Sequence, residues 1–354
     1  MKENGKIGGT PPAAPAVRRR RPTIHDVAVE AGVSTGTVSR VAAGHGSVAD
    51  DTRARVMAAM AKVGYQPNAA ARAMRTNVSK TIGLLIPDIR SPTFIRVAAG
   101  AEEILAPAGY MLLSASSNRS IAREVAFLQA ARQRQMDGLI VSTSDETAEE
   151  TLHELSQMEM PLVILDRDAP PNADLVASEH MHVMQNAVEH LIALGHRRIG
   201  FIGPTQKITP GRMRVIGYRR AHEAAGLPID ERLIRTQTQN SEYGQFETHD
   251  MMTGDAPPTA LIAGSSDIFY GALRAIRLLD MQIPRDLSLV GVDDVQLADL
   301  VGPPVTVIAR DVAKSGQEAA RLILERLQDP DRPPRRLMLE SHLLLRQSTA
   351  APRA

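Results

Sequence analysis

The sequence predicts a small all-α head followed by α/β structure in two doubly wound parallel-sheet lobes. Residues 23–64 place apolar side chains at helical spacing and interrupt them with glycines, which is typical of short packed helices. From residue 81 onward, short apolar runs alternate with amphipathic stretches, the pattern of parallel strands covered by helices. Roughly 270 residues of this alternation exceed one typical core, so we expect two lobes.

The composition excludes several classes of protein. Hydrophobic residues make up 43% and charged residues 23% of the 354 residues, which is ordinary globular usage. The absence of cysteine excludes disulfides and thiolate metal sites and fits a reducing cytoplasm. No run approaches the ~20 apolar residues of a membrane span, and no apolar segment follows the basic N-terminus as in a secretory signal. We therefore expect a cytoplasmic protein without a membrane partner.

Charge is distributed unevenly along the chain. Residues 1–80 hold 13 of the 41 Lys and Arg residues and 5 of the 40 Asp and Glu residues, a net charge of +8. The remaining residues carry a net charge of −7. A basic head on an acidic body indicates a polyanionic partner at the head. The alternative is a solvated basic tail, and the four-arginine run at 18–21 does not by itself decide between them.

The chain is expected to have four parts. Residues 1–21 combine Gly, Pro and Ala with the arginine run and lack apolar periodicity, so we expect a disordered basic arm. Residues 22–66 form the helical head, and residues 67–80 form a short helix and linker. The helix in this linker is too short to be stable without a partner surface. Residues 81–354 form the two-lobed body.

Local signals place three helices in the head. Thr23 is a suitable N-cap, and Asp26 can complete a short capping box. Gly32 can end this first helix in the left-handed conformation. Ser34 can cap the second helix, and the third begins near Asp50, whose charge suits a helix N-terminus.

The body is expected to alternate strands and helices throughout. The expected strands are 82–86, 110–115, 138–142, 162–165, 198–202, 260–263 and 287–292. The expected helices are 94–107, 120–135, 147–158, 180–194, 211–226, 267–280 and 311–328.

The segment 23–41, Thr-Ile-His-Asp-Val-Ala … Ala-Gly-Val-Ser-Thr-Gly-Thr-Val-Ser-Arg-Val, resembles the helix-turn-helix of the LacI/GalR repressor family. Its physical logic is that small Ala28 lets two helices approach, Gly32 makes the turn and Val38 fills the gap. The motif Tyr-Gln-Pro-Asn at 65–68 follows at the family's spacing, and the resemblance extends over the chain from residue 22. The alternative is that these residues form a three-helix bundle that does not bind DNA.

The resemblance implies which head residues contact operator DNA. Thr35, Gly36 and Arg40 occupy the positions that face base edges, and Arg40 suits a guanine or a phosphate. Gly36 has no side chain, so direct readout there is reduced. Hydroxyl and amide side chains are expected at phosphates, with a role as cap or surface hydroxyl the equal alternative. These residues are Thr23, Ser34, Thr37, Ser39, Thr52, Tyr65 and Asn68.

By the same resemblance, residues 68–75 form a hinge helix that folds on DNA and enters the minor groove. Arg72 lies in this segment, and Met74 stands where the family usually has a leucine that wedges between bases. The alternative for Met74 is packing between protomers. Ala43 also departs from the family, which usually has Asn there.

The body resembles the periplasmic sugar-binding-protein fold, on stretches such as Gly-Leu-Leu-Ile-Pro-Asp at 83–88, Leu-Asp-Arg at 165–167 and Val-Gly-Val-Asp-Asp at 290–294. Ligands bind such sheets at the carboxyl ends of strands. Polar residues just past strands, an arginine that the family places at a helix start to hold the effector, and one aromatic residue are therefore candidate effector ligands. They are Phe94, Asp166, Arg214, Ser266, Asp267 and Asp293.

Carboxylates together with an arginine suit a polyhydroxylated ligand, because they accept from and donate to adjacent hydroxyls. Asp293 and Arg214 are the leading candidates, and Phe94 is a candidate stacking platform. For Asp267 the alternative is a cap on the helix that follows it. Ser266 stands where the family usually has Asn, and its shorter side chain reaches less far toward a ligand.

These expectations combine into a transcriptional regulator, a repressor by resemblance, that binds operator DNA as a homodimer. A small molecule, a sugar or sugar acid, would bind between the lobes and change operator affinity allosterically. The effector could lower this affinity, as an inducer, or raise it, as a corepressor. A solute-binding protein would lack the basic head and carry a secretory signal. An enzyme would show a catalytic constellation, and the sequence shows neither that nor metal-ligand spacing, so no cofactor is expected.

Overall fold

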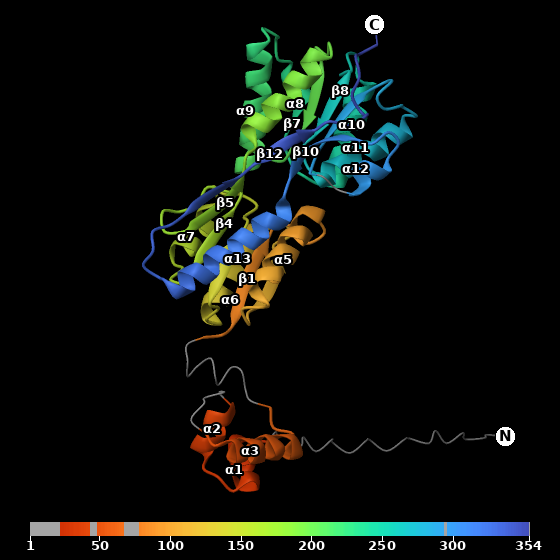
Figure 1. Ribbon diagram of the computed structural model, residues 1–354. Helices are drawn as coiled ribbons and strands as arrows, with labels where there is room; N and C mark the ends of the chain where they lie inside the picture. The colour runs from red at the N-terminus through yellow and green to blue at the C-terminus, as the bar shows by residue number, and fades with distance from the viewer. Residues whose placement is uncertain (1–21, 43–47, 67–77, 294–295, 354) are drawn as a thin grey trace, which may run out of the picture. The chain divides into compact units, whose positions relative to one another are not determined.

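The computed structural model describes residues 22–42, 48–66, 78–293 and 296–353. The chain divides into two compact units, Met1–Thr76 and Asn77–Ala354, which are described separately below (Figure 1). The arm expected at 1–21 and the hinge residues Asn68, Arg72 and Met74 lie outside the described residues.

The head contains the three expected helices, α1 (Ile24–Ala31), α2 (Thr35–Ala42) and α3 (Asp50–Val63). Thr23 and Asp26 form the predicted capping box, with the Thr23 amide 2.7 Å from Asp26 Oδ2. Gly32 ends α1 at a φ of 65° in the left-handed region, which a glycine adopts without strain. The apolar faces of the three helices enclose one small core: Val27, Ala28, Ala31, Val38, Val41, Val56, Ala59 and Met60.

The first lobe of the body is a six-stranded parallel sheet in the order β11-β5-β4-β3-β1-β2. Its strands are β1 (Thr81–Ile86), β2 (Met111–Ser116), β3 (Gly138–Val141), β4 (Leu162–Leu165), β5 (Asp174–Ser178) and β11 (Arg336–Leu339). Its helices are α5 (Pro92–Leu105), α6 (Ile121–Gln133), α7 (Glu149–Ser156) and α13 (Val312–Gln328). Side chains of β1 alternate between the two faces, so Leu84 packs with α5 and α13 while Leu85 packs with α6.

The second lobe repeats this plan in the order β12-β10-β9-β8-β6-β7, with β12 antiparallel to β10. Its strands are β6 (Ile199–Ile202), β7 (Ile234–Arg235), β8 (Ala260–Ala263), β9 (Ser288–Val292), β10 (Thr306–Arg310) and β12 (Ser341–Leu344). Its helices are α8 (Met181–Ala193), α9 (Thr209–Ala224), α10 (Ser241–Thr253), α11 (Ser266–Leu278), the short α12 (Gln296–Leu300) and the 3-10 turn Glu231–Leu233. The predicted fold class, a helical head and two doubly wound lobes, is confirmed.

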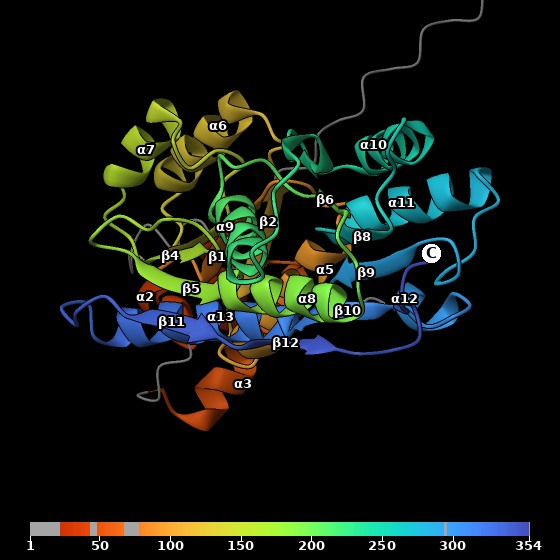
Figure 2. The same ribbon diagram turned by 90° about the horizontal axis from the view of Figure 1, so that it is seen from above.

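The chain crosses between the lobes three times, after β5, after β10 and after β11 (Figures 1 and 2). The parallel strands of both sheets point their carboxyl ends toward these crossings, so the loops that follow the strands face one another. This topology places residues from distant parts of the chain in one cleft.

Two glycines let the outer helices of the first lobe approach closely. A Cβ on Gly316 of α13 would lie 2.0 Å from the carbonyl oxygen of Val97, and one on Gly100 of α5 would lie 2.0 Å from that of Ala313. Both distances are far below van der Waals contact, so neither position accepts a side chain without separation of α5 and α13.

Several elements were absent from the prediction: β5, β7, β10, β11, β12, α10 and α12. Most of the missed strands are short or begin or end on charged residues, such as Asp174 in β5 and Arg310 in β10, which obscures an apolar run. Edge strands β11 and β12 have every second residue exposed and gain their stability from pairing. Within the described residues, none of the helices has the length and apolar character needed to cross a membrane.

Candidate ligand cleft and DNA-facing head

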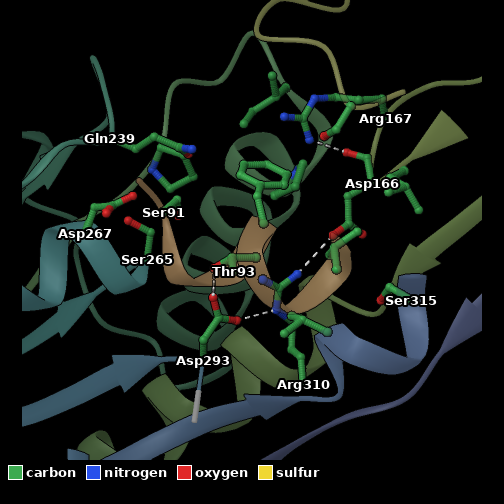
Figure 3. A pocket seen from close by; sticks show the side chains of 18 of the residues that line it. Ser91, Thr93, Asp166, Arg167, Gln239, Ser265, Asp267, Asp293, Arg310 and Ser315 are labelled. Atoms are coloured by element: carbon green, nitrogen blue, oxygen red, sulfur yellow. Dashed lines mark hydrogen bonds and ion pairs between the residues drawn. The ribbon is translucent and has the colours of Figure 1, made fainter. Parts of the chain in front are cut away.

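A cavity lies between the two lobes of the body, at the carboxyl ends of strands from both sheets (Figure 3). Loops after β1 and β4 and the start of α5 line it from the first lobe, and loops after β6, β8 and β9 line it from the second. Its polar lining residues are Ser91, Thr93, Ser142, Asp166, Arg167, Arg214, Gln239, Ser265, Asp267, Asp293, Arg310 and Ser315.

Arg310, at the end of β10, joins two carboxylates across the cleft (Figure 3). Its Nε lies 2.7 Å from Oδ1 of Asp293, and its Nη1 lies 3.0 Å from Oδ2 of Asp166. Both aspartates directly follow a strand and adopt positive φ values, 50° at Asp166 and 71° at Asp293. Left-handed backbone of this kind is uncommon outside glycine and costs free energy, although aspartate tolerates it better than most residues.

Asp293 is buried, and both of its oxygens accept hydrogen bonds. Its second oxygen, Oδ2, accepts from Thr93 Oγ1 at 2.7 Å and from Ser266 Oγ at 3.1 Å. Burial opposes ionisation of this carboxyl, but the charge and hydrogen bond of Arg310 outweigh it and lower its pKa to about 2. Asp293 is therefore a carboxylate at neutral pH.

His180, at the crossing from β5 to α8, links the same network to Arg214. Arginine only donates, so the contact of 3.4 Å from Arg214 Nη2 makes His180 Nδ1 an acceptor. The proton on Nε2 then faces Oδ1 of Asp166 at 3.1 Å. Burial lowers the pKa of His180 to about 4 despite the neighbouring carboxylate, so the ring is neutral at pH 7.

Arg214 and Arg167 are buried guanidinium groups held mainly by uncharged partners. Arg214 Nη1 donates to the carbonyl oxygen of Gly264 at 2.7 Å. Arg167 donates to the carbonyl oxygens of Thr143 at 2.6 Å and Asp166 at 2.7 Å. Burial, followed by repulsion from Arg310, lowers the pKa of Arg214 to about 10.

Of the six predicted effector residues, five line the cavity: Phe94, Asp166, Arg214, Asp267 and Asp293. Ser266 does not line it and instead donates a hydrogen bond to Asp293. The alternative role of Asp267 as a helix cap is wrong, because Ser265 caps α11 by accepting from the Ile268 amide at 3.2 Å. Asp267 is thereby left to face the cavity beside Ser91 (Figure 3).

Sequence reasoning missed three members of the network: Arg167, His180 and Arg310. Arg167 could have been found, since it directly follows Asp166 in the quoted Leu-Asp-Arg stretch. Arg310 could not be placed because strand β10 was not predicted. His180 belongs to a connection between lobes, which only the topology identifies.

Ion pairs also connect the lobes at the rim of the cleft. Lys207 Nζ lies 2.9 Å from Asp145 Oδ2, and Arg212 Nη2 lies 2.9 Å from Asp168 Oδ2. Arg212 also contacts the buried carboxylate of Glu146. These contacts belong to a closed cleft, because Lys207 and Arg212 come from the second lobe and their partners from the first.

The start of α2 in the head presents polar groups to solvent. Ser34 caps the helix, with its Oγ 3.2 Å from the Thr37 amide, and Arg40 Nη2 lies 3.3 Å from Thr37 Oγ1. Thr35, Gly36 and Arg40 are exposed, whereas Val38 is buried in the head core. Thr23 is occupied as a cap, and Tyr65 packs partly on that core.

The part of the chain that the structure describes holds no group of three or more His, Asp and Glu residues arranged to bind a metal ion.

A model of bacterial regulatory proteins of the lacI family matches residues 23–68, and a model of the periplasmic binding protein-like domain matches residues 188–349.

Similar proteins match over nearly the whole length. The chain is 32% identical to the HTH-type transcriptional regulator DegA of Bacillus subtilis over 93% of this chain and 98% of the relative. It is 33% identical to the ribose operon repressor of Haemophilus influenzae over 92% of this chain and 98% of the relative. The crystal structure of the lac repressor dimer bound to operator and the anti-inducer ONPF superposes with a TM-score of 0.81 at 26% identity, over 94% of this chain and 100% of that one. The chain therefore belongs to the LacI family: it is a DNA-binding transcriptional repressor regulated by an effector, and it is not an enzyme.

Proposed function

We propose that this repressor binds its operator as a homodimer and that a sugar or sugar derivative in the interlobe cleft controls operator affinity. The observation that carries this proposal is the network of Arg310, Asp166 and Asp293, whose atoms come from both lobes. A ligand that competes for these groups changes the balance between open and closed lobes, and a conformational change of this kind can be transmitted to a DNA-binding head. The crystallised lac repressor dimer on its operator supports the oligomeric state.

The DNA-facing residues are proposed from their exposure on α2 and from the family pattern. Thr35, Gly36 and Arg40 meet base edges. Ser34, which is exposed, and Thr37, which is half-buried, lie at the start of the same helix and contact phosphates. The remaining contacts are to the phosphate backbone and, in the hinge, to the minor groove. They are Thr23, Ser39, Thr52, Tyr65, Asn68, Arg72 and Met74.

The sugar class is supported by chemistry and by relatives. Carboxylate, hydroxyl and guanidinium groups together match a ligand with several hydroxyls, and one relative is named for the ribose operon. In our proposal the boundaries are 22–66 for the head, 67–80 for the hinge and 81–354 for the effector-binding and dimerisation domain, and the protein acts in the cytoplasm.

The test uses the full chain and DNA selected by it from a random pool. Fluorescence anisotropy should give sequence-specific binding that weakens as salt rises, because phosphate contacts release counterions. Arg40→Ala should weaken binding by about 1–3 kcal/mol, whereas Arg197→Ala, a substitution in the body outside the cleft, should not. If a sugar panel never alters operator affinity, effector control by sugars is wrong, and if Arg40→Ala binds like the parent, the head assignment is wrong.

A further inference from the structure

Three arginine side chains, Arg167, Arg214 and Arg310, line the cavity between the lobes that Figure 3 shows. In Figure 3, Arg167 lies above the centre of the cavity and Arg310 below it. Each guanidinium carries five N–H groups. The hydrogen bonds among the described residues engage two N–H groups of each arginine, which leaves further donors for a ligand.

The carboxylates of the network are, by contrast, already engaged as acceptors. Asp166 accepts from the Ser178 amide at 2.7 Å, from His180 and from Arg310. Asp293 accepts from Arg310, Thr93 and Ser266. A carboxylate offers about four acceptor sites, so each retains little capacity for ligand hydroxyls.

Electrostatics point the same way. Arg214 is repelled by Arg310 and Arg167 and attracted at longer range by Asp293 and Asp166, but no carboxylate among the described residues forms an ion pair with Arg214 or Arg167. Arg310 forms ion pairs with two carboxylates, whereas Arg167 and Arg214 donate hydrogen bonds to carbonyl oxygens and to a neutral imidazole. A buried guanidinium that hydrogen-bonds only uncharged groups lacks a directly bonded counter-ion, and an incoming anion can take that position.

The part of the cavity around Asp267 differs in chemistry from the part lined by the arginines. It lies beside Ser91, away from the arginine network, and burial raises its pKa. Its neighbours Ser91 and Gln239 are neutral hydrogen-bonding groups (Figure 3). This end suits hydroxyl groups, since a carboxyl, a hydroxyl and an amide can each donate or accept.

From these contacts we infer that the effector is a small polyhydroxylated carboxylate, whose carboxylate group binds the free N–H groups of Arg167 and Arg214 and whose hydroxyls face Asp267. This inference rests on the proposed function and narrows its ligand class to acids. A neutral sugar would satisfy fewer of the donors, because each hydroxyl that accepts from an arginine must place its own proton on an acceptor, and the nearby carboxylates are engaged.

The test compares acids with neutral compounds of the same carbon skeleton on the full chain. D-Gluconate is paired with D-glucitol, D-galactonate with galactitol, and D-ribonate with ribitol. Because the chain has no tryptophan, melting is followed by far-UV circular dichroism. At least one acid should raise Tm by about 5 °C at 100 times its Kd, and its neutral partner at the same concentration should raise Tm by clearly less. The inference is overturned if no acid exceeds its neutral partner, whether the neutral compound binds or neither does.

Arg214→Gln and Arg167→Gln identify the binding groups. Each should weaken binding of the acid at least about tenfold and leave the weak binding of the neutral partner unchanged. The ratio of the two affinities is the readout, so partial loss of folding does not obscure it. Arg220→Gln, an exposed position on the same helix as Arg214, is the matched control and should keep the parent's preference. An unchanged preference in both cleft variants contradicts the assignment.

Operator binding measured on the same samples separates the two levels of the proposal. If a neutral sugar binds and alters operator affinity while no acid does, effector control of operator binding is supported, and the inference that the effector is an acid is wrong. If the protein binds no DNA under any condition, the proposed function itself falls.

Discussion

Nη1 of Arg310 lies 3.0 Å from Oδ2 of Asp166, although the two residues are 144 positions apart in the sequence. Arg310 ends the strand that leaves the second sheet, and Asp166 follows a strand of the first sheet. This ion pair therefore holds the two lobes together at the floor of the cleft. Because Arg310 also binds Asp293, its removal would leave two carboxylates without their cation.

Replacement of Arg310 by Met should destabilise the body by about 3–5 kcal/mol, since breaking a buried ion pair leaves uncompensated charge. Urea unfolding followed by far-UV circular dichroism measures this loss. The triple variant with Asp166→Asn and Asp293→Asn should recover part of it, because the stranded charges are then gone. A single variant as stable as the parent would contradict the role assigned to Arg310.

Acidification should destabilise the protein through His180 before the carboxylates titrate. The pKa of His180 falls from 6.5 in the unfolded chain to about 4 in the fold. The unfolded state therefore binds more protons between these values, and stability is lost as pH falls from about 6.5 toward 4. The slope from this one group is at most about 1.4 kcal/mol per pH unit.

A comparison of variants isolates this contribution from other buried histidines. His180→Gln should give a flatter dependence of unfolding free energy on pH in this window, and His249→Gln, at an exposed position, should follow the parent. Equal slopes in the parent and His180→Gln would show that His180 is not buried in its neutral form. Asp293 acts at lower pH, because its pKa of about 2 removes stability only as pH falls from about 4 toward 2.

The glycine at position 36 should be dispensable for folding. A Cβ there would meet only Ser34 Oγ at 3.7 Å, an ordinary contact. Gly36→Ala should therefore stabilise the head by up to about 1 kcal/mol through helix propensity, while operator affinity changes because the position faces DNA. Gly32→Ala is the contrast, and its φ of 65° should make it destabilising. A destabilised Gly36→Ala head would indicate a structural need for this glycine.

Helix packing in the first lobe should depend on Gly316. An alanine there places Cβ 2.0 Å from the Val97 carbonyl oxygen, so α5 and α13 must separate. We expect a loss of about 1–3 kcal/mol in unfolding free energy. Gly254→Ala, whose nearest neighbour would be the Asp250 carbonyl oxygen at 3.4 Å, is the control and should stay within about 0.5 kcal/mol of the parent. Equal effects of the two substitutions would rule out tight packing at Gly316.

Much of the local structure was predictable because its causes are local. The capping box of Thr23 and Asp26 and the left-handed turn at Gly32 depend on residues within one helical turn of each other. Buried strands such as β1 and β8 appear as short apolar runs, since both faces of a parallel sheet are covered. Asp166 was identified by its place after a predicted strand, Arg214 and Asp293 also by family pattern, and all three lie at the cleft.

The tertiary structure alone decided which of these groups remain free for a ligand. The sequence by itself determined that acids would follow the strands and that an arginine would lie near the start of a helix, but not that Arg310 would already bind both Asp166 and Asp293. It likewise did not distinguish Ser265, which caps α11, from Asp267, which faces the cavity. The physical reason is that a hydrogen bond between distant residues depends on topology and side-chain direction, whereas caps and periodicity depend only on near neighbours.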